Sequence, residues 1–125
     1  MERKIKIISG TVEITGTLSD CPAAAAAIWD ALPLKSTAET WGDEVYFTIP
    51  VQVELDDTAR EVVMKGDLGY WPSGPAFCIF FGPTPASRGA EIRPASAVNV
   101  FGKITGDLSE LKKVRSGSAI LVEKA

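Results

Sequence analysis

The charged residues Arg88, Glu91 and Arg93, in the stretch ASRGAEIRPAS, have the types and spacing that could bind a charged ligand. A guanidinium group makes two parallel hydrogen bonds to a carboxylate or a phosphate, so two neighbouring arginines could hold such a group. The same three residues could instead form an Arg–Glu pair that holds a solvated loop. The sequence leaves both interpretations open.

A second candidate is the aromatic span GYWPSGPAFCIFFGPTP, residues 69–85. Its rings could line an apolar cleft that grips a proline ring or a small planar ligand. Core packing is the alternative, because successive side chains of a strand point to opposite faces. We therefore predict that Phe77, Ile79 and Phe81 face the interior, with Tyr70 and Trp71 at the rim. The predicted ligand-binding residues are Tyr70, Trp71, Phe77, Phe81, Arg88, Glu91 and Arg93.

Other reactive side chains are few. The chain has no histidine, which excludes Ser-His-Asp triads, Cys-His dyads and histidine-based zinc sites. Cys21 and Cys78 are far apart and are interpreted as two reduced thiols that fill space. The acidic pairs Asp43-Glu44 and Asp56-Asp57 could serve acid-base chemistry or a hard metal, but solvated surface is the favoured reading. We predict no metal site and no cofactor, and we assign no catalytic residue.

Composition restricts the partners and the compartment. A chain of 125 residues is expected to form one domain, residues 1–125. Its net charge is −3 and it has no basic run, so a nucleic-acid partner is not expected. The beginning MERKIKIISG lacks an apolar signal region, and no apolar run approaches the roughly 18 residues of a membrane span. We expect a cytoplasmic protein that does not bind membranes.

Alternating apolar residues dominate the elements that must position these candidates. Alternation over residues 45–55 predicts one long strand, bent or at a sheet edge where Pro50 lacks an N–H. Gly42-Asp43 suits a type II′ hairpin turn before that strand. Further strands are expected around residues 5–7, 12–18, 68–71, 76–82, 98–104 and 118–123. Helices are expected over residues 19–32 and 106–117, and residues 82–97 are expected to form a long ordered loop. Trp29 and Trp41 are interpreted as packing on the first helix and at the hairpin.

Many strands with two short helices predict a mainly β fold, a closed barrel, since closure removes exposed strand edges. Three stretches, TWGDEVYF, GDLGYWPSGPAFCIFFGPTPAS and NVFGKITGD, occur in this order. They resemble the small prokaryotic cyclophilin-like family of single-domain proteins, whose functions are largely uncharacterised. The resemblance covers most of the chain and implies a cyclophilin-like β-barrel with two short capping helices, one over each open end.

The resemblance also implies the functions to be weighed. True cyclophilins are prolyl isomerases that use an arginine after a Phe-His pair, a pattern that is missing from this sequence. Its single glutamine, Gln52, also lacks the Gln-Phe-Phe context. We therefore expect a binding module for a small molecule or an extended peptide, without catalysis. The alternative is a weak peptidyl-prolyl isomerase, for which Arg60, Arg88 and Arg93 are the candidate donors.

Overall fold

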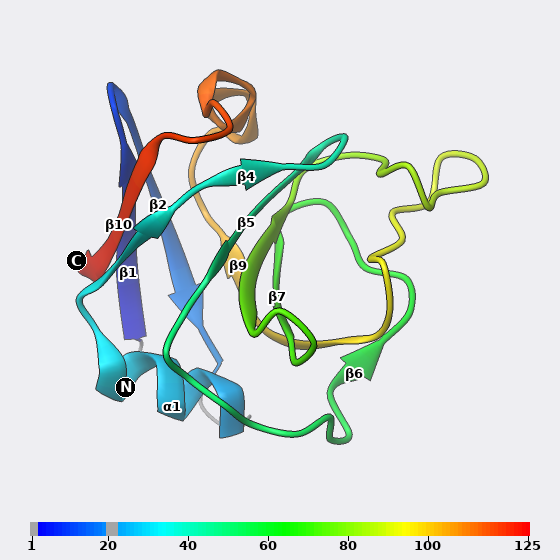
Figure 1. The fold of residues 1–125 in the computed structure, drawn as a ribbon, viewed down its shortest axis with the longest axis horizontal. Coiled ribbons are helices and arrows are strands. Elements are labelled where there is room, and N and C mark those ends of the chain that lie inside the picture. Colours follow the sequence, from blue (N-terminus) through cyan, green and yellow to red (C-terminus); the bar gives the residue numbers. More distant parts are fainter. Residues whose placement is uncertain (1–2, 20–22) are drawn as a thin grey trace.

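The computed structural model describes residues 3–19 and 23–125, and its strands form one antiparallel sheet that curls into a barrel (Figure 1). Around the sheet the strand order is β3-β10-β1-β2-β9-β7-β8-β5-β4, with β6 paired to β9. The strands are β1 (Arg3–Ser9), β2 (Val12–Leu18), β3 (Leu34–Thr37), β4 (Glu39–Thr40), β5 (Glu44–Thr48), β6 (Ala59–Arg60), β7 (Asp67–Trp71), β8 (Ala76–Phe80), β9 (Val98–Ile104) and β10 (Ala119–Lys124).

The barrel is nearly closed by the short segment that contains β3 and β4. β3 pairs with β10, and β4, two residues further along the chain, pairs with β5. Ala38 lies between them, fully buried, and its N–H donates to the Ser118 carbonyl at 2.8 Å. The Ser36 hydroxyl adds a 2.8 Å bond to the Thr48 carbonyl. The prediction of a mainly β barrel is confirmed.

The interior is filled by the apolar face of each strand. Phe77 lies stacked on Phe47, with ring centroids 4.8 Å apart, and meets the edge of Phe101 at 5.0 Å. Phe77 and Ile79 are fully buried and Phe81 is 8% exposed, and all three belong to this core as predicted. Tyr70 also points inward, and its hydroxyl donates to the Val51 carbonyl at 2.6 Å. The predicted rim position of Tyr70 is therefore wrong, and these aromatic rings serve mainly to pack the core.

One helix lies at each end of the barrel, α1 at the bottom and η1 at the top of Figure 1. α1 (Ala23–Ala31) lies within the helix expected over residues 19–32 and buries Ala24, Ala25 and Ile28. The helix was expected to begin at Ser19 or Asp20, and Asp20, Cys21 and Pro22 lie outside the described residues. η1 (Leu108–Lys113) is a 3₁₀ helix that buries Leu111, and Asp107 caps it by accepting the Ser109 N–H at 2.9 Å. Both helices thus cover the core at the ends of the barrel.

The predicted strand over residues 45–55 is wrong in length, because β5 ends at Thr48. Pro50 supplies no N–H for a ladder, and the chain leaves the sheet there. Burial still alternates as far as Val51, because Ile49 and Val51 pack into the core and the Val51 carbonyl accepts the Tyr70 hydroxyl. The short strands β3 and β6 were not predicted. The loop over residues 82–97 has no strand of its own, as expected, and Ile92 forms an isolated bridge with Val63, which also lies outside the strands.

Candidate functional site

The outer face of β5 and β8 carries a second apolar cluster, separate from the barrel interior. Tyr46 lies opposite Cys78 across the two strands, and Glu44 lies opposite Phe80. Because side chains alternate along a strand, these residues point away from the core that holds Val45 and Phe47. The cluster consists of Val63, Ala76, Cys78, Phe80, Ile92 and Val98, with Tyr46, Trp71 and Val100 packed against it.

A cavity of about 210 Å³ lies on this outer face. We call it the outer cavity. Its walls come from the β4–β5 hairpin, the end of β7, the middle of β8, the long loop and the start of β9. The lining residues are Trp41, Glu44, Tyr46, Trp71, Cys78, Pro94, Ala95 and Val98. The three aromatic residues are half-buried, so part of each ring remains free to contact a ligand.

The hairpin turn that presents Trp41 and Glu44 is fixed by its neighbours. Gly42 has φ +60°, while Asp43 has a negative φ, as the predicted type II′ turn requires. A Cβ at position 42 would lie 2.9 Å from Cδ of Pro85, so only glycine fits. The Asp43 N–H donates to the Pro83 carbonyl at 3.0 Å, and the Phe81 N–H donates to the Asp43 carbonyl at 2.9 Å. The turn is thereby held against the start of the long loop.

The long loop is held over the opposite side of the outer cavity by hydrogen bonds of its own. The Trp71 indole N–H donates to the Ser96 hydroxyl at 2.6 Å. The Ser87 hydroxyl accepts the N–H groups of Thr84 at 3.0 Å and Arg93 at 3.2 Å. The Thr84 hydroxyl donates to the Arg93 carbonyl. These bonds fix the backbone on both sides of Pro94 and Ala95, which line the cavity.

Glu44 is the acidic residue of the outer cavity, and it is only 5% exposed. Burial raises the pKa of its carboxyl group from 4.5 to about 7, and the adjacent Cys78 thiol opposes part of that rise by hydrogen bonding. Burial, together with the negative charge of Glu44, raises the pKa of the Cys78 thiol well above its usual value. The thiol therefore stays protonated near neutral pH, and the carboxyl group changes its charge there.

Of the residues predicted to bind a ligand, Trp71 lines the outer cavity. Tyr70, Phe77 and Phe81 belong to the barrel interior instead. The structure does not bring these four aromatic residues together, because neighbouring strand positions face opposite sides of the wall.

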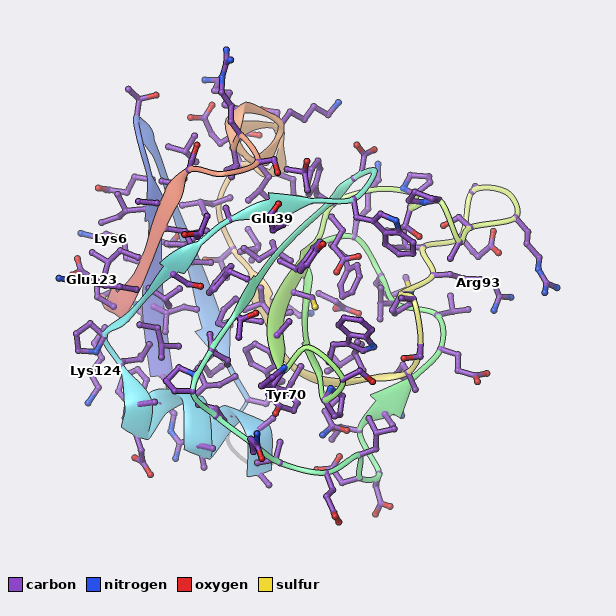
Figure 2. All side chains as sticks on the ribbon, in the orientation of Figure 1. Lys6, Glu39, Tyr70, Arg93, Glu123 and Lys124 are labelled. Carbon is purple, nitrogen blue, oxygen red and sulfur yellow. The ribbon has the colours of Figure 1, made fainter. Side chains whose placement is uncertain are left out.

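The three charged residues of the prediction lie on the long loop, and Figure 2 shows Arg93 at the opposite side of the molecule from Lys6 and Glu123. The Arg93 side chain donates to the Glu91 carboxylate at 2.9 Å. Glu91 also accepts the backbone N–H groups of Arg88 at 3.1 Å and Gly89 at 2.8 Å. The Arg93 bond and then the Arg88 N–H lower the pKa of Glu91 to about 2. This geometry matches the second interpretation, an Arg–Glu pair that holds the loop.

Sequence reasoning missed Trp41, Glu44 and Tyr46. The reading of Glu44 as solvated surface is wrong, because the long loop and the hairpin enclose its side chain. The signal that could have found Glu44 and Tyr46 is their position, since they alternate with the inward residues Val45 and Phe47 and share the face of Cys78. The Asp43 carboxylate lies beside Gly82, while Glu44 lines the outer cavity, so the two carboxyl groups serve different surroundings.

Two further observations concern metal sites and membrane spans. In the part of the chain that the structure describes, no three His, Cys, Asp or Glu side chains gather into a possible metal site. Within residues 3–19 and 23–125, no helix is long and apolar enough to span a membrane.

A nearly closed antiparallel barrel with a helix at each end defines this protein as a cyclophilin-like barrel protein. The family model described as cyclophilin-like matches residues 3–123, and the chain belongs to that family. It is similar to a hypothetical protein from Archaeoglobus fulgidus known from a solution structure, with 45% sequence identity and a TM-score of 0.83. That match covers 99% of this chain and 95% of the archaeal one. No curated protein matches the chain.

Proposed function

We propose that this protein is a binding module that holds a small ligand, or one side chain of an extended peptide, in the outer cavity. The observation that carries the proposal is an apolar cavity of about 210 Å³ walled by Trp41, Tyr46 and Trp71. An apolar protein cavity of about 150 Å³ accommodates benzene, so this one has room for one substituted ring. A dinucleotide or another large cofactor exceeds that volume.

The side chains in the outer cavity support binding rather than reaction. A cysteine nucleophile needs its thiolate form, and burial keeps the Cys78 thiol protonated. Glu44 lines the cavity without a second carboxylate, so the acid-base pair of a glycosidase-type mechanism is not assembled from the described lining residues. Aromatic walls with a few polar groups are typical of sites that hold a ligand.

Peptidyl-prolyl isomerase activity is the alternative function. It would need a donor that polarises the amide in an apolar cleft. Among the described residues, no arginine lines the outer cavity. Arg93 is bonded to Glu91, and Arg60 donates to the carbonyls of Asp57 and Ala59. A protease-coupled isomerisation assay on a proline peptide tests this alternative directly, and a rate above the uncatalysed one would favour it over simple binding.

Tryptophan fluorescence offers a direct test of binding, because Trp41 and Trp71 line the outer cavity while Trp29 lies elsewhere, beneath the Lys124 ammonium group at 4.6 Å. The test is a titration with small aromatic ligands and short proline-containing peptides. A bound ligand should change the fluorescence of the wild type and of Trp29→Phe. The change should shrink in Trp71→Phe, the matched variant at the cavity.

Thermal unfolding gives an independent measure of the same event. A ligand present at 100 times its dissociation constant should stabilise the fold by roughly 2.7 kcal/mol. If no ring-sized ligand and no peptide changes either the fluorescence or the melting temperature, the binding proposal is wrong.

A further inference from the structure

The outer cavity combines aromatic walls with a buried acid that has no cationic partner. The ion pairs within residues 3–19 and 23–125 join Arg93 to Glu91 and Lys113 to Glu110, and neither involves Glu44. The Cys78 thiol, which has a single hydrogen, can direct it to the Glu44 carboxyl group or to the Ala76 carbonyl, 3.9 Å from the sulfur. Charged side chains are rarely buried unless they are paired, so the carboxyl group of Glu44 lacks the partner that its position calls for.

Two arginines of the described residues flank the cavity walls, and both are bonded to other groups. Arg60 lies opposite Val98 across the β6–β9 pair, but its guanidinium donates to two backbone carbonyls of its own segment. Arg93 precedes Pro94 in the loop, and it is bonded to Glu91. Both arginines next to the cavity walls are therefore held by other groups.

Aromatic rings favour a cation as the missing partner. The face of a tryptophan or tyrosine ring carries partial negative charge and attracts an ammonium group, most strongly where water is excluded. Trp41, Tyr46 and Trp71 line the same cavity as the Glu44 carboxyl group. We infer that the outer cavity binds a small organic cation, an alkylammonium or arylammonium group, with Glu44 as its counter-ion and the three rings as its walls. This inference rests on the proposed function and names its ligand class.

The proton on Glu44 should compete with such a ligand. The other titratable residues that line the cavity are Tyr46 on β5 and Cys78 on β8, while the loop and β9 contribute the uncharged Pro94, Ala95 and Val98. Asp43 follows Gly42 in the turn, and its carboxylate packs against Gly82. Because the pKa of Glu44 is about 7, about a tenth of the molecules carry its negative charge at pH 6 and about nine tenths at pH 8. A permanently charged ligand should therefore bind about tenfold more tightly at pH 8 than at pH 6.

The experiment compares three probes of similar size: benzylammonium, the uncharged benzyl alcohol and the anionic benzoate. Each is titrated into the wild type, Glu44→Gln and Glu39→Gln, at pH 6 and pH 8, with binding followed by tryptophan fluorescence. Glu39→Gln is the matched control, because it removes one negative charge at an exposed position on the adjacent strand β4. Circular dichroism spectra establish that each variant folds.

We expect benzylammonium to bind the wild type and Glu39→Gln alike, and to bind Glu44→Gln at least about tenfold more weakly. Its affinity for the wild type should rise about tenfold from pH 6 to pH 8, a measurement that holds even if Glu44→Gln fails to fold. The affinity for benzyl alcohol should change neither with pH nor with the Glu44→Gln substitution.

Four results would overturn the inference. If benzyl alcohol binds as tightly as benzylammonium, the outer cavity selects neutral ligands and only the proposed function stands. If the affinity for benzylammonium rises toward low pH, Glu44 acts as a neutral hydrogen-bond donor, and again only the proposed function stands. Preferential binding of benzoate would mean that the ligand is an anion. If none of the three probes binds, the inference and the proposed function both fail.

Discussion

The buried carboxyl group of Glu44 is expected to make the fold less stable as pH rises. Its pKa is about 7 in the folded protein and near 4.5 in the unfolded chain, so the folded state holds the proton more tightly. The resulting stabilisation is fully present below pH 4.5 and is lost as pH rises through about 7. A pKa difference of about 2.5, at about 1.4 kcal/mol per pKa unit, corresponds to about 3 kcal/mol.

The assay is urea unfolding of the wild type and Glu44→Gln between pH 5 and pH 8. The linkage relation places about 2.5 kcal/mol of the loss within this range. Other groups titrate in both proteins, so the quantity to follow is the difference between their free energies of unfolding. That difference should shift by about 2.5 kcal/mol in favour of Glu44→Gln as pH rises. Glu13→Gln, an exposed position on β2, is the control and should follow the wild type.

Parallel curves for the wild type and Glu44→Gln would refute the reasoning. They would mean that the Glu44 carboxyl group is solvated in the folded protein, and that the outer cavity does not enclose it.

Four other substitutions test the fold and the loop. Phe77→Ala removes a ring packed between Phe47 and Phe101 and should cost about 3–5 kcal/mol in urea unfolding; a loss below about 1 kcal/mol would contradict its place in the core. Gly42→Ala should cost about 1–3 kcal/mol and weaken ligand binding, because the new Cβ has no room beside Pro85. Gly10 has a similar φ of +59°, but a Cβ added there would meet no atom within 4 Å. Gly10→Ala should therefore cost less than Gly42→Ala, and equal costs would show that crowding is irrelevant. Arg88→Ala, at an exposed loop position, should change stability by no more than about 0.5 kcal/mol, and a larger loss would mean that its guanidinium supports the fold.

Most of the barrel could be predicted because the pattern of each strand is visible within a short segment of the sequence. Val12, Ile14 and Leu18 alternate with polar residues and form the buried face of β2. Gly42 marked the hairpin turn, since few other residues adopt its conformation. Each of these signals depends on residues within one strand or one turn, so no knowledge of distant contacts was needed.

The rest of the fold and most of the candidate site depend on contacts between distant residues. β3 (Leu34–Thr37) contains a single large apolar residue and is a strand only because β10 pairs with it. Glu44 reads as a surface residue until Pro94 and Ala95, about 50 positions later, enclose it. Trp71 could be predicted as a site residue because the aromatic span singled it out, but its indole is positioned by Ser96 in the loop.

The two faces of β5 and β8 assign packing of the barrel core and the proposed ligand binding to alternate positions of the same strands. Odd-numbered positions such as 45, 47, 77 and 79 fill the core, while positions 44, 46 and 78 line the outer cavity. If the proposed function holds, substitutions confined to the second set should change which ligands bind while leaving the packing of the barrel interior in place. Relatives that keep the first set and differ at the second should share this architecture while having diverged in the molecules they recognise.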